Sequence, residues 1–304
     1  MCYNLVSFCI KHTKSKFFAS SETLFSVSDI AKVYTHRAIW PEEVMKRFWK
    51  DLKNHWKYAL QSAKSELKSE VANSYLSWIW WVLEPFCFML IYAFIFGVVF
   101  NGKEEHFGIF IFIGLTGWEF FNRCLTQSVK MMRNNKSIVT KVYIPKFILL
   151  ISKMFFNGYK MMISFGIVAV MLIYYRVHIT WNIIFIIPII LVLFVVSFAC
   201  MTFLMHYGVF VRDLENVVHI GLRMVFYMTG IFYNIETRLP QKYVSILMKG
   251  NPMALIIGSM RKCILYGQTP DLKWLAVWFV IGILVSAAGI RKIYKNENSY
   301  VKVI

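Results

Sequence analysis

Long apolar runs separated by short polar turns dominate the chain after residue 77. They extend over about 78–100, 107–125, 147–174, 181–206, 217–233 and 274–290. A helix needs about 20 residues to cross the hydrocarbon core of a bilayer, and the length of each run is close to or above this value. Continuous runs also exclude a transmembrane barrel, whose strands would alternate between apolar and polar residues. We therefore expect an all-α polytopic membrane protein with six transmembrane helices.

A different kind of helix is predicted before the first run. Pro41 with Glu42 and Glu43 is a typical helix start. Apolar residues then recur every three or four positions, at Trp49, Leu52, Trp56, Leu60, Ala63, Leu67 and Val71. Five lysines lie largely off this stripe, at positions 50, 53, 57, 64 and 68. The pattern predicts an amphipathic helix at 41–73 in the membrane interface, or alternatively one packed on a partner protein.

These patterns divide the chain into four parts. We expect a cytoplasmic extension at 1–40, which could also reflect a start codon assigned too far upstream. The amphipathic helix at 41–73, a six-span domain at 74–290 and a basic cytoplasmic tail at 291–304 follow. Lys and Arg are concentrated on the side of the two termini. The positive-inside rule therefore places both termini in the cytoplasm.

Composition supports a membrane protein and argues against an enzyme. Hydrophobic residues make up 58% of the chain, and the formal net charge is +18. The basic residues cluster near the predicted membrane ends, so they indicate anionic lipid head groups rather than nucleic acid. The six cysteines show no metal-ligand spacing. A phosphate-binding G-x-x-x-x-G-K-[ST] loop is also absent. We expect no catalytic, metal or cofactor-binding residue in this chain; a membrane-embedded glycosyltransferase is the minor alternative.

Several ionisable residues interrupt the apolar runs. Glu119 and Arg123 are four residues apart, so they can pair on one helix face. Lys153 and Lys160 are two turns apart on one face of the third span. Charge is costly in lipid, so this face is expected to turn toward a partner span or a conduit. Pairing of Lys160 with Glu84, or with carbonyls at span ends, is the structural alternative.

Aromatic residues in the first span are candidates for a polymer path. Trp80, Trp81 and Tyr92 flank Glu84 and Pro85 in this span. An aromatic face can bind the C–H surface of a sugar without requiring one sugar sequence. Together with Glu84, Lys153 and Lys160, these three aromatics are the predicted translocation-path residues. Packing within the protein and a membrane-interface belt are the alternatives for the aromatics.

A set of short motifs in fixed order resembles a known family over about residues 55–290. The motifs are Glu66-Leu67-Lys68, the run from Ser74 to Pro85, Val142 to Lys146, Val211 to Leu214, Gly230 to Tyr233, and Asn251-Pro252-Met253. In this order and spacing they resemble the type-2 ABC permeases that export polysaccharide, O-antigen, capsule or teichoic acid. One departure is Thr229-Gly230, where many relatives carry Ser-Pro.

This resemblance implies a function and a set of partners. The chain would be a permease subunit that moves a lipid-linked polysaccharide or teichoic-acid polymer out of the cytoplasm. A drug or a lipid is the alternative cargo. The permease subunit would form a homodimer in the bacterial cell (inner) membrane, with the translocation path at the subunit interface. Two copies of a separate ATPase would bind ATP and Mg²⁺ and drive transport.

The resemblance also assigns roles to particular segments. A coupling helix would contact the ATPase through Asn135, Lys136, Ile138, Val139, Lys141, Val142 and Tyr143. A surface loop that binds lipid phosphate is the alternative for this segment. The residues themselves, rather than the resemblance, predict that Arg212 and Asp213 tie the ends of spans four and five by an ion pair; a direct substrate role is the alternative. Two short helices, at about 241–248 and 253–265, would form an outer gate around Asn251 and Pro252; a plain interfacial loop is the alternative.

Overall fold

The computed structural model describes residues 41–72, 77–99, 104, 106–178, 180–238 and 240–303. All regular structure within these residues is helical, which confirms the expected all-α class. The predicted extension at 1–40 and most of the first polar turn lie outside the described residues. The elements are α3 (Pro41–Ala72), α4 (Ser77–Tyr92), the π-helix η2 (Ala93–Val99), α5 (Phe107–Val129), α6 (Met131–Asn134), α7 (Lys136–Lys141), α8 (Lys146–Tyr174), the 3-10 helix η3 (Trp181–Phe185), α9 (Ile186–Phe210), α10 (Leu214–Met228), α11 (Ile235–Arg238), α12 (Gln241–Gly250), α13 (Pro252–Ile264), α14 (Leu272–Lys295) and α15 (Glu297–Val303).

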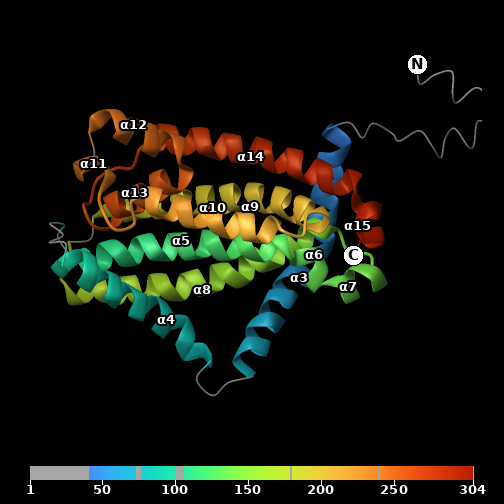
Figure 1. The fold of residues 1–304 in the computed structure, drawn as a ribbon, viewed down its shortest axis with the longest axis horizontal. Helices are drawn as coiled ribbons and strands as arrows, with labels where there is room; N and C mark the ends of the chain where they lie inside the picture. The colour runs from blue at the N-terminus through green and yellow to red at the C-terminus, as the bar shows by residue number, and fades with distance from the viewer. Residues whose placement is uncertain are drawn as a thin grey trace, which may run out of the picture. The chain divides into compact units, whose positions relative to one another are not determined.

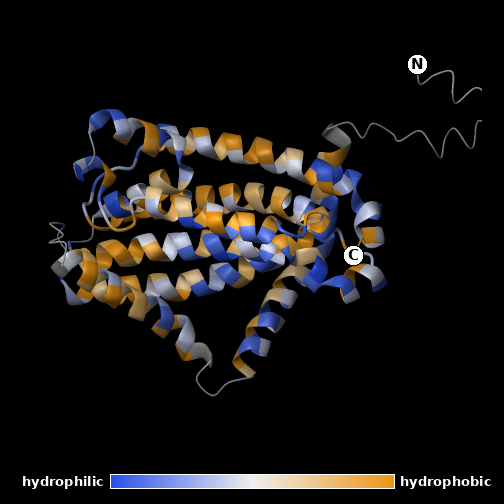
Figure 2. Cartoon of the chain, viewed as in Figure 1, coloured by the Kyte–Doolittle hydropathy of each residue, from blue (hydrophilic) through white to orange (hydrophobic). Residues whose placement is uncertain are grey.

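The long helices α5, α8, α9 and α14 and the shorter α10 run lengthwise beside one another (Figure 1). Helix α5 is the centre of the bundle, because it contacts α4, α8, α9, α10 and α13. Helix α14 packs along α9. The short helices α6, α7 and α15 gather at one end of the bundle, and α11, α12 and α13 gather at the other (Figure 1). The residues between the two ends are mostly hydrophobic, and much of the hydrophilic sequence lies at the ends (Figure 2).

Among the described residues, four helical stretches are long and apolar enough to cross a membrane: Ile79–Gly97, Lys146–Tyr174, Trp181–Phe210 and Leu272–Lys295. They correspond to the first, third, fourth and sixth predicted spans. The second predicted span lies in α5, which carries Glu119 and Arg123. The fifth lies in α10, which has only 15 residues.

The predicted end of the fifth span at residue 233 is wrong, because α10 stops at Met228. The chain turns at Gly230, whose φ of 70° lies in the left-handed region that glycine adopts without strain. A Cβ at this position would also overlap the side chain of Ile235. The departure from Ser-Pro at Thr229-Gly230 therefore coincides with a sharp helix end.

Helix α3 packs against α8 through a narrower strip than the predicted stripe. The fully covered positions are Val44, Ala59 and Ala63. Trp49 and Trp56, which belong to the predicted stripe, are 62% and 42% exposed. The covered strip is offset because two small alanines allow α8 to approach closely, while the larger side chains flank the contact. Both tryptophans are exposed, and the expected position of α3 in the membrane interface stays a prediction.

Small residues set the close contacts of α9 with its neighbours. A Cβ at Gly282 of α14 would lie 2.8 Å from Cγ1 of Val195, and one at Gly289 would overlap Thr202. The two glycines are seven residues apart on α14, and Val195 and Thr202 are seven residues apart on α9. The two contacts therefore lie along one seam between parallel helices. Gly208 of α9 lies against α5, where a Cβ would overlap the backbone carbonyl of Val129. Small residues of this kind allow helix backbones in membranes to approach closely.

Gly208→Ala is expected to destabilise the protein by about 1–3 kcal/mol, the usual cost of overpacking a core. Its new methyl group would meet backbone atoms of Val129, which cannot move aside as a flexible side chain could. Thermal unfolding of the purified protein in detergent measures the effect. Gly166→Ala on α8 is the matched control, because no heavy atom lies within 4 Å of its added Cβ. Equal melting temperatures for the two variants would contradict the close approach of α9 and α5.

Candidate coupling surface and translocation residues

The predicted coupling segment forms the short helix α7 and an extended stretch after it. The helix covers six residues, Lys136–Lys141. Helix α5 ends shortly before it in sequence, and α8 begins shortly after it. Val139 is 5% exposed and anchors the segment against the protein. Lys141, Val142 and Tyr143 are exposed, with Val142 at 54% and Tyr143 at 65%. Helix α7 therefore presents a partly apolar outer surface at the end of the bundle.

Of the other predicted coupling residues, Asn135 faces α6 and supports the bend before α7. Its side-chain amide donates to the carbonyl of Met131 at 2.9 Å. Ile138 is half-buried, and Lys136 is exposed. The structure thus divides the predicted set into inward anchors, Asn135 and Val139, and an outer surface that a partner can reach.

Tyr143 also belongs to a polar hub, which we define as Arg47, Asp51, Tyr143, Tyr294 and Glu297. Arg47 donates to the Tyr143 hydroxyl at 2.6 Å and pairs with the Glu297 carboxylate at 3.3 Å. The Tyr143 hydroxyl donates to the same carboxylate at 3.4 Å. The Tyr294 hydroxyl donates to Asp51 at 2.8 Å. The polar hub therefore joins the segment after α7 to α3, α14 and α15.

Glu297 is the most constrained member of the polar hub. Its side chain is 12% exposed, and its Oε1 is buried without a hydrogen-bond partner among the described residues. Burial raises the pKa of the carboxyl group, although the nearby Arg47 cation acts in the opposite direction. The carboxylate thus depends on Arg47 and Tyr143 for its compensation.

The turn between α9 and α10 differs from its prediction. Arg212 and Asp213 are both exposed, and no ion pair joins them in the part of the chain that the structure describes. Lys130, which follows α5, instead pairs with Glu215 of α10 at 2.5 Å. Arg133 donates to the carbonyl of Gly208 at 3.4 Å. The end of α9 and the start of α10 are therefore both tied to the α5–α6 junction rather than to each other.

Lys153 and Lys160 of α8 both have carboxylate partners on α3. Lys153 pairs with Glu66, and Lys160 pairs with Glu70 at 2.7 Å. The side chain of Lys160 is only 11% exposed. The predicted face away from lipid is thus turned toward α3. The partner of Lys160 is Glu70 rather than Glu84, which was one of the two structural alternatives, because α3 lies against α8 at this level.

Glu84 instead joins the predicted pair in α5. Arg123 pairs with Glu119 at 3.2 Å, as its spacing predicts, and with Glu84 at 3.1 Å. The three charges link α4 to α5. Trp81 lies one turn before Glu84, and its ring is 5.3 Å from the Lys160 ammonium. A small cavity of about 30 Å³ lies between these groups and is also lined by Pro85.

The remaining path candidates lie at different depths of α4. Trp80 is 53% exposed. Tyr92 lies three turns farther along the chain, 4.8 Å from the ring of Phe232. Phe232 in turn contacts Phe226 and Tyr227 of α10, with ring centroids 5.2 and 6.4 Å apart. These aromatics connect α4 to α10 on one side of the bundle.

Helix α10 carries an outward polar stripe that sequence reasoning did not propose as a site. Asn216, His219 and Arg223 are exposed and recur at spacings of three and four. Val217, Ile220, Met224 and Tyr227 lie beside them and are each about 60% exposed. Leu222 is the buried position of this helix. A helix beside membrane spans does not direct such polar groups into lipid without cost.

At the opposite end of the bundle, Asn251 and Pro252 begin α13. The Asn251 side chain accepts from the backbone amides of Met253 and Ala254, and Pro252 takes the first helical position. The Asn251 amide also donates to Thr229 at the end of α10, at 3.3 Å. Two short helices, α12 and α13, are present where the outer gate was predicted, and their gating role stays a prediction.

Arg261 of α13 is buried beneath this end. Its guanidinium donates to three backbone carbonyls: Phe110 at 3.1 Å, Gly230 at 2.7 Å and Ile231 at 2.7 Å. It also lies over the Phe110 ring, with Cζ 3.5 Å from the centroid. Gly114 leaves room for the Arg261 guanidinium, because a Cβ at position 114 would lie 2.6 Å from Arg261 Nη2. Arg261 therefore holds α5, the turn after α10, and α13 together.

Comparison with known proteins identifies the family. A model of the family described as ABC-2 type transporter matches residues 60–265, which cover α4 to α13 and the last part of α3. The chain belongs to the ABC-2 type transporter family. With four helices long and apolar enough to span, this ABC-2 chain is a multi-pass membrane protein.

Two relatives of this ABC-2 chain carry the description "O-antigen export system permease protein RfbA". One, from Klebsiella pneumoniae, is 26% identical over 240 residues, which are 79% of this chain and 92% of the relative. The other, from Myxococcus xanthus, is 24% identical over 241 residues, which are 79% and 93% of the two chains. The resemblance expected from the motifs is therefore confirmed.

Several residues of this ABC-2 permease lacked a sequence signal for their role. Arg261 stands beside Lys262 near Cys263 and resembles an ordinary basic helix end. Only its place after an apolar stretch of α13, from Met253 to Ile257, could have indicated burial. Glu70 and Glu297 belong to mixed-charge segments, where a carboxylate is unremarkable.

Proposed function

We propose that the chain is the permease subunit of an ATP-driven exporter in the bacterial inner membrane. Its cargo is a lipid-linked polysaccharide of the O-antigen or teichoic-acid type, which moves from the cytoplasm to the outside. The descriptions of the two relatives support the polysaccharide class. The family supports a transport subunit that works with a separate ATPase.

The outward polar stripe of α10 is the observation that carries the proposal. Arg223 lies in a helix that packs on the central α5, so a lipid-facing position would be costly for it. A second copy of the chain placed against α10 would enclose the stripe in a shared path. Trp80, Glu84 and Tyr92 of α4 would line the same path, since Phe232 joins α4 to α10.

This arrangement requires that α5 and α10 also cross the membrane, which gives six spans. Helix α5 contacts α4, α8 and α9 and runs lengthwise beside α8 and α9 (Figure 1). Its charges are neutralised by the Glu84–Arg123–Glu119 group. Helix α10 is short, and the turn at Gly230 returns the chain to α11 and α12. Helices α12 and α13 would then form the outer gate.

The partner ATPase would bind the exposed surface of α7. Lys141, Val142 and Tyr143 form the accessible part of this surface. Two ATPase copies, one for each permease copy, would bind ATP and Mg²⁺. Helix α15 lies at the same end of the bundle as α7 (Figure 1). Docking of a cytoplasmic ATPase at this end would place the carboxyl-terminal tail in the cytoplasm.

A crosslink between two α10 helices is expected to stop export. Met224→Cys in a Cys87→Ser background places one thiol on the exposed face of α10, where Met224 is 63% exposed. Cys87 is removed because it is exposed on α4. Oxidation should give a disulfide-linked dimer and block the appearance of new polymer at the cell surface. Reduction should restore export.

Val280→Cys on α14 is the matched control, because Val280 is apolar and 54% exposed on a different helix. It should give no dimer, and export should continue under oxidation. Crosslinking through Val280 in place of Met224 would move the interface to α14. Surface polymer that is unaffected by loss of the gene would refute the export function itself.

A further inference from the structure

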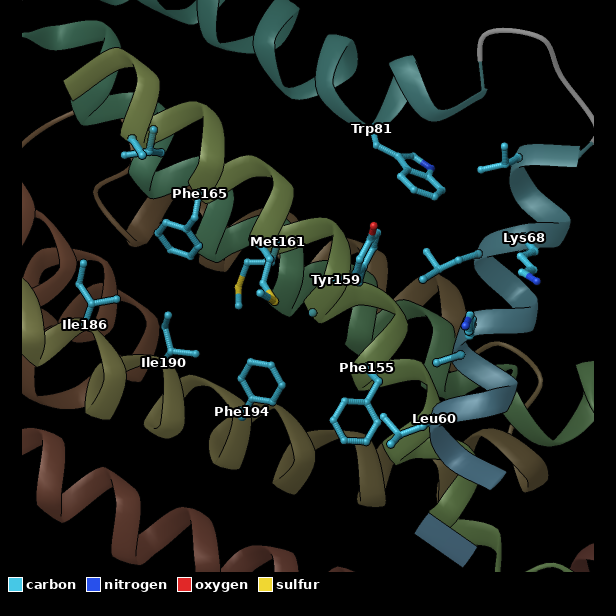
Figure 3. Close-up of a pocket in the computed structure, with 18 of the residues that line it drawn as sticks. Leu60, Lys68, Trp81, Phe155, Tyr159, Met161, Phe165, Ile186, Ile190 and Phe194 are labelled. Atoms are coloured by element: carbon cyan, nitrogen blue, oxygen red, sulfur yellow. The ribbon is translucent and has the colours of Figure 1, made fainter. Parts of the chain in front are cut away.

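An open groove lies between α3, α8 and α9. Its volume is about 1330 Å³, above the about 300–1,000 Å³ of typical small-molecule pockets. Figure 3 shows α3 on one side, α8 behind, and the start of α9 opposite, with Trp81 of α4 at the edge. The groove does not overlap the polar stripe of α10.

The wall of this groove is almost entirely apolar. Tyr159, Met161 and Phe165 of α8 face Ile190 and Phe194 of α9 across it (Figure 3). Phe155 of α8 and the apolar α3 residues that line the groove, beginning with Leu60, continue the apolar wall. Such a lining offers dispersion contacts to hydrocarbon along its length and few hydrogen-bonding groups.

The charged residues of the groove are confined to its α3 side. Lys64 and Lys68 are one turn apart, both line the groove and both are exposed. Neither forms an ion pair or hydrogen bond with any residue that the structure describes. The nearby α3 carboxylates, Glu66 and Glu70, are engaged by Lys153 and Lys160 of α8. The groove therefore joins an apolar trough to two cations without an internal counter-charge.

We propose that this groove binds an anionic phospholipid. The acyl chains lie along α8 and α9, and the phosphate contacts Lys64 and Lys68. Basic pockets between membrane helices bind anionic head groups in this way, and amphipathic basic helices such as α3 favour an anionic membrane surface. The bound lipid fills the space between α3 and α8, and so supports the α3 position set by the Glu66–Lys153 and Glu70–Lys160 pairs.

Native mass spectrometry of the purified full-length permease, titrated with phosphatidylglycerol, tests this site. Lys64→Gln together with Lys68→Gln should weaken phosphatidylglycerol binding by about tenfold or more, since each lysine near an anionic head group contributes about fivefold. Lys53→Gln with Lys57→Gln is the matched control, because this pair has the same spacing on α3 but does not line the groove. The control should bind as wild type does. Phosphatidylcholine should bind more weakly and should not distinguish the variants.

A second variant tests the apolar part of the site. Ala169 is exposed and lines the groove, so Ala169→Trp places an indole in it and narrows it without changing charge. This variant should lose bound phosphatidylglycerol while keeping its melting temperature. Unchanged binding in the Lys64/Lys68 variant or in Ala169→Trp would overturn the proposal. Displacement of phosphatidylglycerol by a much lower concentration of a polyprenyl phosphate would assign the groove to a carrier lipid and would also overturn it.

Discussion

Arg261→Met should leave little folded permease. The change would strand the buried carbonyls of Gly230 and Ile231 and remove the side-chain bond to the carbonyl of Phe110, in a place where Arg261 itself is only 4% exposed. Each buried polar group without a partner costs about 1–3 kcal/mol, so the two stranded carbonyls alone should cost at least about 2 kcal/mol. Arg261→Lys should recover only part of this loss, because an ammonium group cannot reach three carbonyls as a planar guanidinium does.

Lys262→Met is the control for this prediction. Lys262 is the next residue and carries the same charge, but its partners Glu236 and Asp271 are 39% and 54% exposed. Ion pairs of this kind contribute about 0–1 kcal/mol. Thermal unfolding and size-exclusion profiles in detergent should separate the two variants clearly. Similar profiles for both would show that the buried arginine is not needed to hold α5, α10 and α13 together.

Arg47→Met should uncouple ATP hydrolysis from export. Arg47 links Tyr143, after α7, to α3, and it pairs with the same Glu297 carboxylate of α15 that Tyr143 contacts. Without it, movement of α7 by the ATPase would no longer be passed to α3. We expect export to fall by tenfold or more, while ATP hydrolysis by the assembled complex falls less than about twofold; tenfold corresponds to about 1.4 kcal/mol.

The effect of Arg47→Met on folding has to be separated from its effect on coupling. Arg47→Met alone removes the cation that pairs directly with the Glu297 carboxylate and leaves only the weaker influence of Lys146, so the protein should also lose stability. Burial already raises the Glu297 pKa, so the folded state binds the proton more tightly than the unfolded state. Stability from this group is therefore greatest below its ordinary pKa and falls as pH rises through the raised value. The stability deficit of Arg47→Met should accordingly be smaller near pH 5 than near pH 7.5.

Adding Glu297→Gln to Arg47→Met should restore the melting temperature but not export. Lys50→Met, one turn farther along α3 and exposed, is the control and should change neither. Export that recovers with the melting temperature would mean that the polar hub only supports folding.

The sequence predicted what local pattern determines. Apolar runs located the long helices, because the length of a span is set by the thickness of the bilayer. The spacing of Glu119 and Arg123 predicted their ion pair, since residues four apart meet on one helix face. The Asn251-Pro252 pair predicted the start of α13 through capping.

Long-range pairing could not be read in the same way. Lys160 finds Glu70, which lies 90 residues earlier in the chain. The choice of Glu70 over Glu84 depends on how α3 lies against α8. The strip that α3 buries was also displaced from the apolar stripe, because Ala59 and Ala63 permit a closer contact than Trp56 and Leu60 would. Spacing along one helix does not contain this information.

The position of Glu297 after α14 affects when the polar hub can form. Glu297 is synthesised after Arg47, Tyr143 and every long helix among the described residues, so the polar hub can close only after α14 has left the ribosome. Tyr300, three residues later, is fully buried and its hydroxyl lies 2.7 Å from His206 Nδ1. The long helices can therefore insert before the segment after α7 is braced, and α15 completes this brace after them.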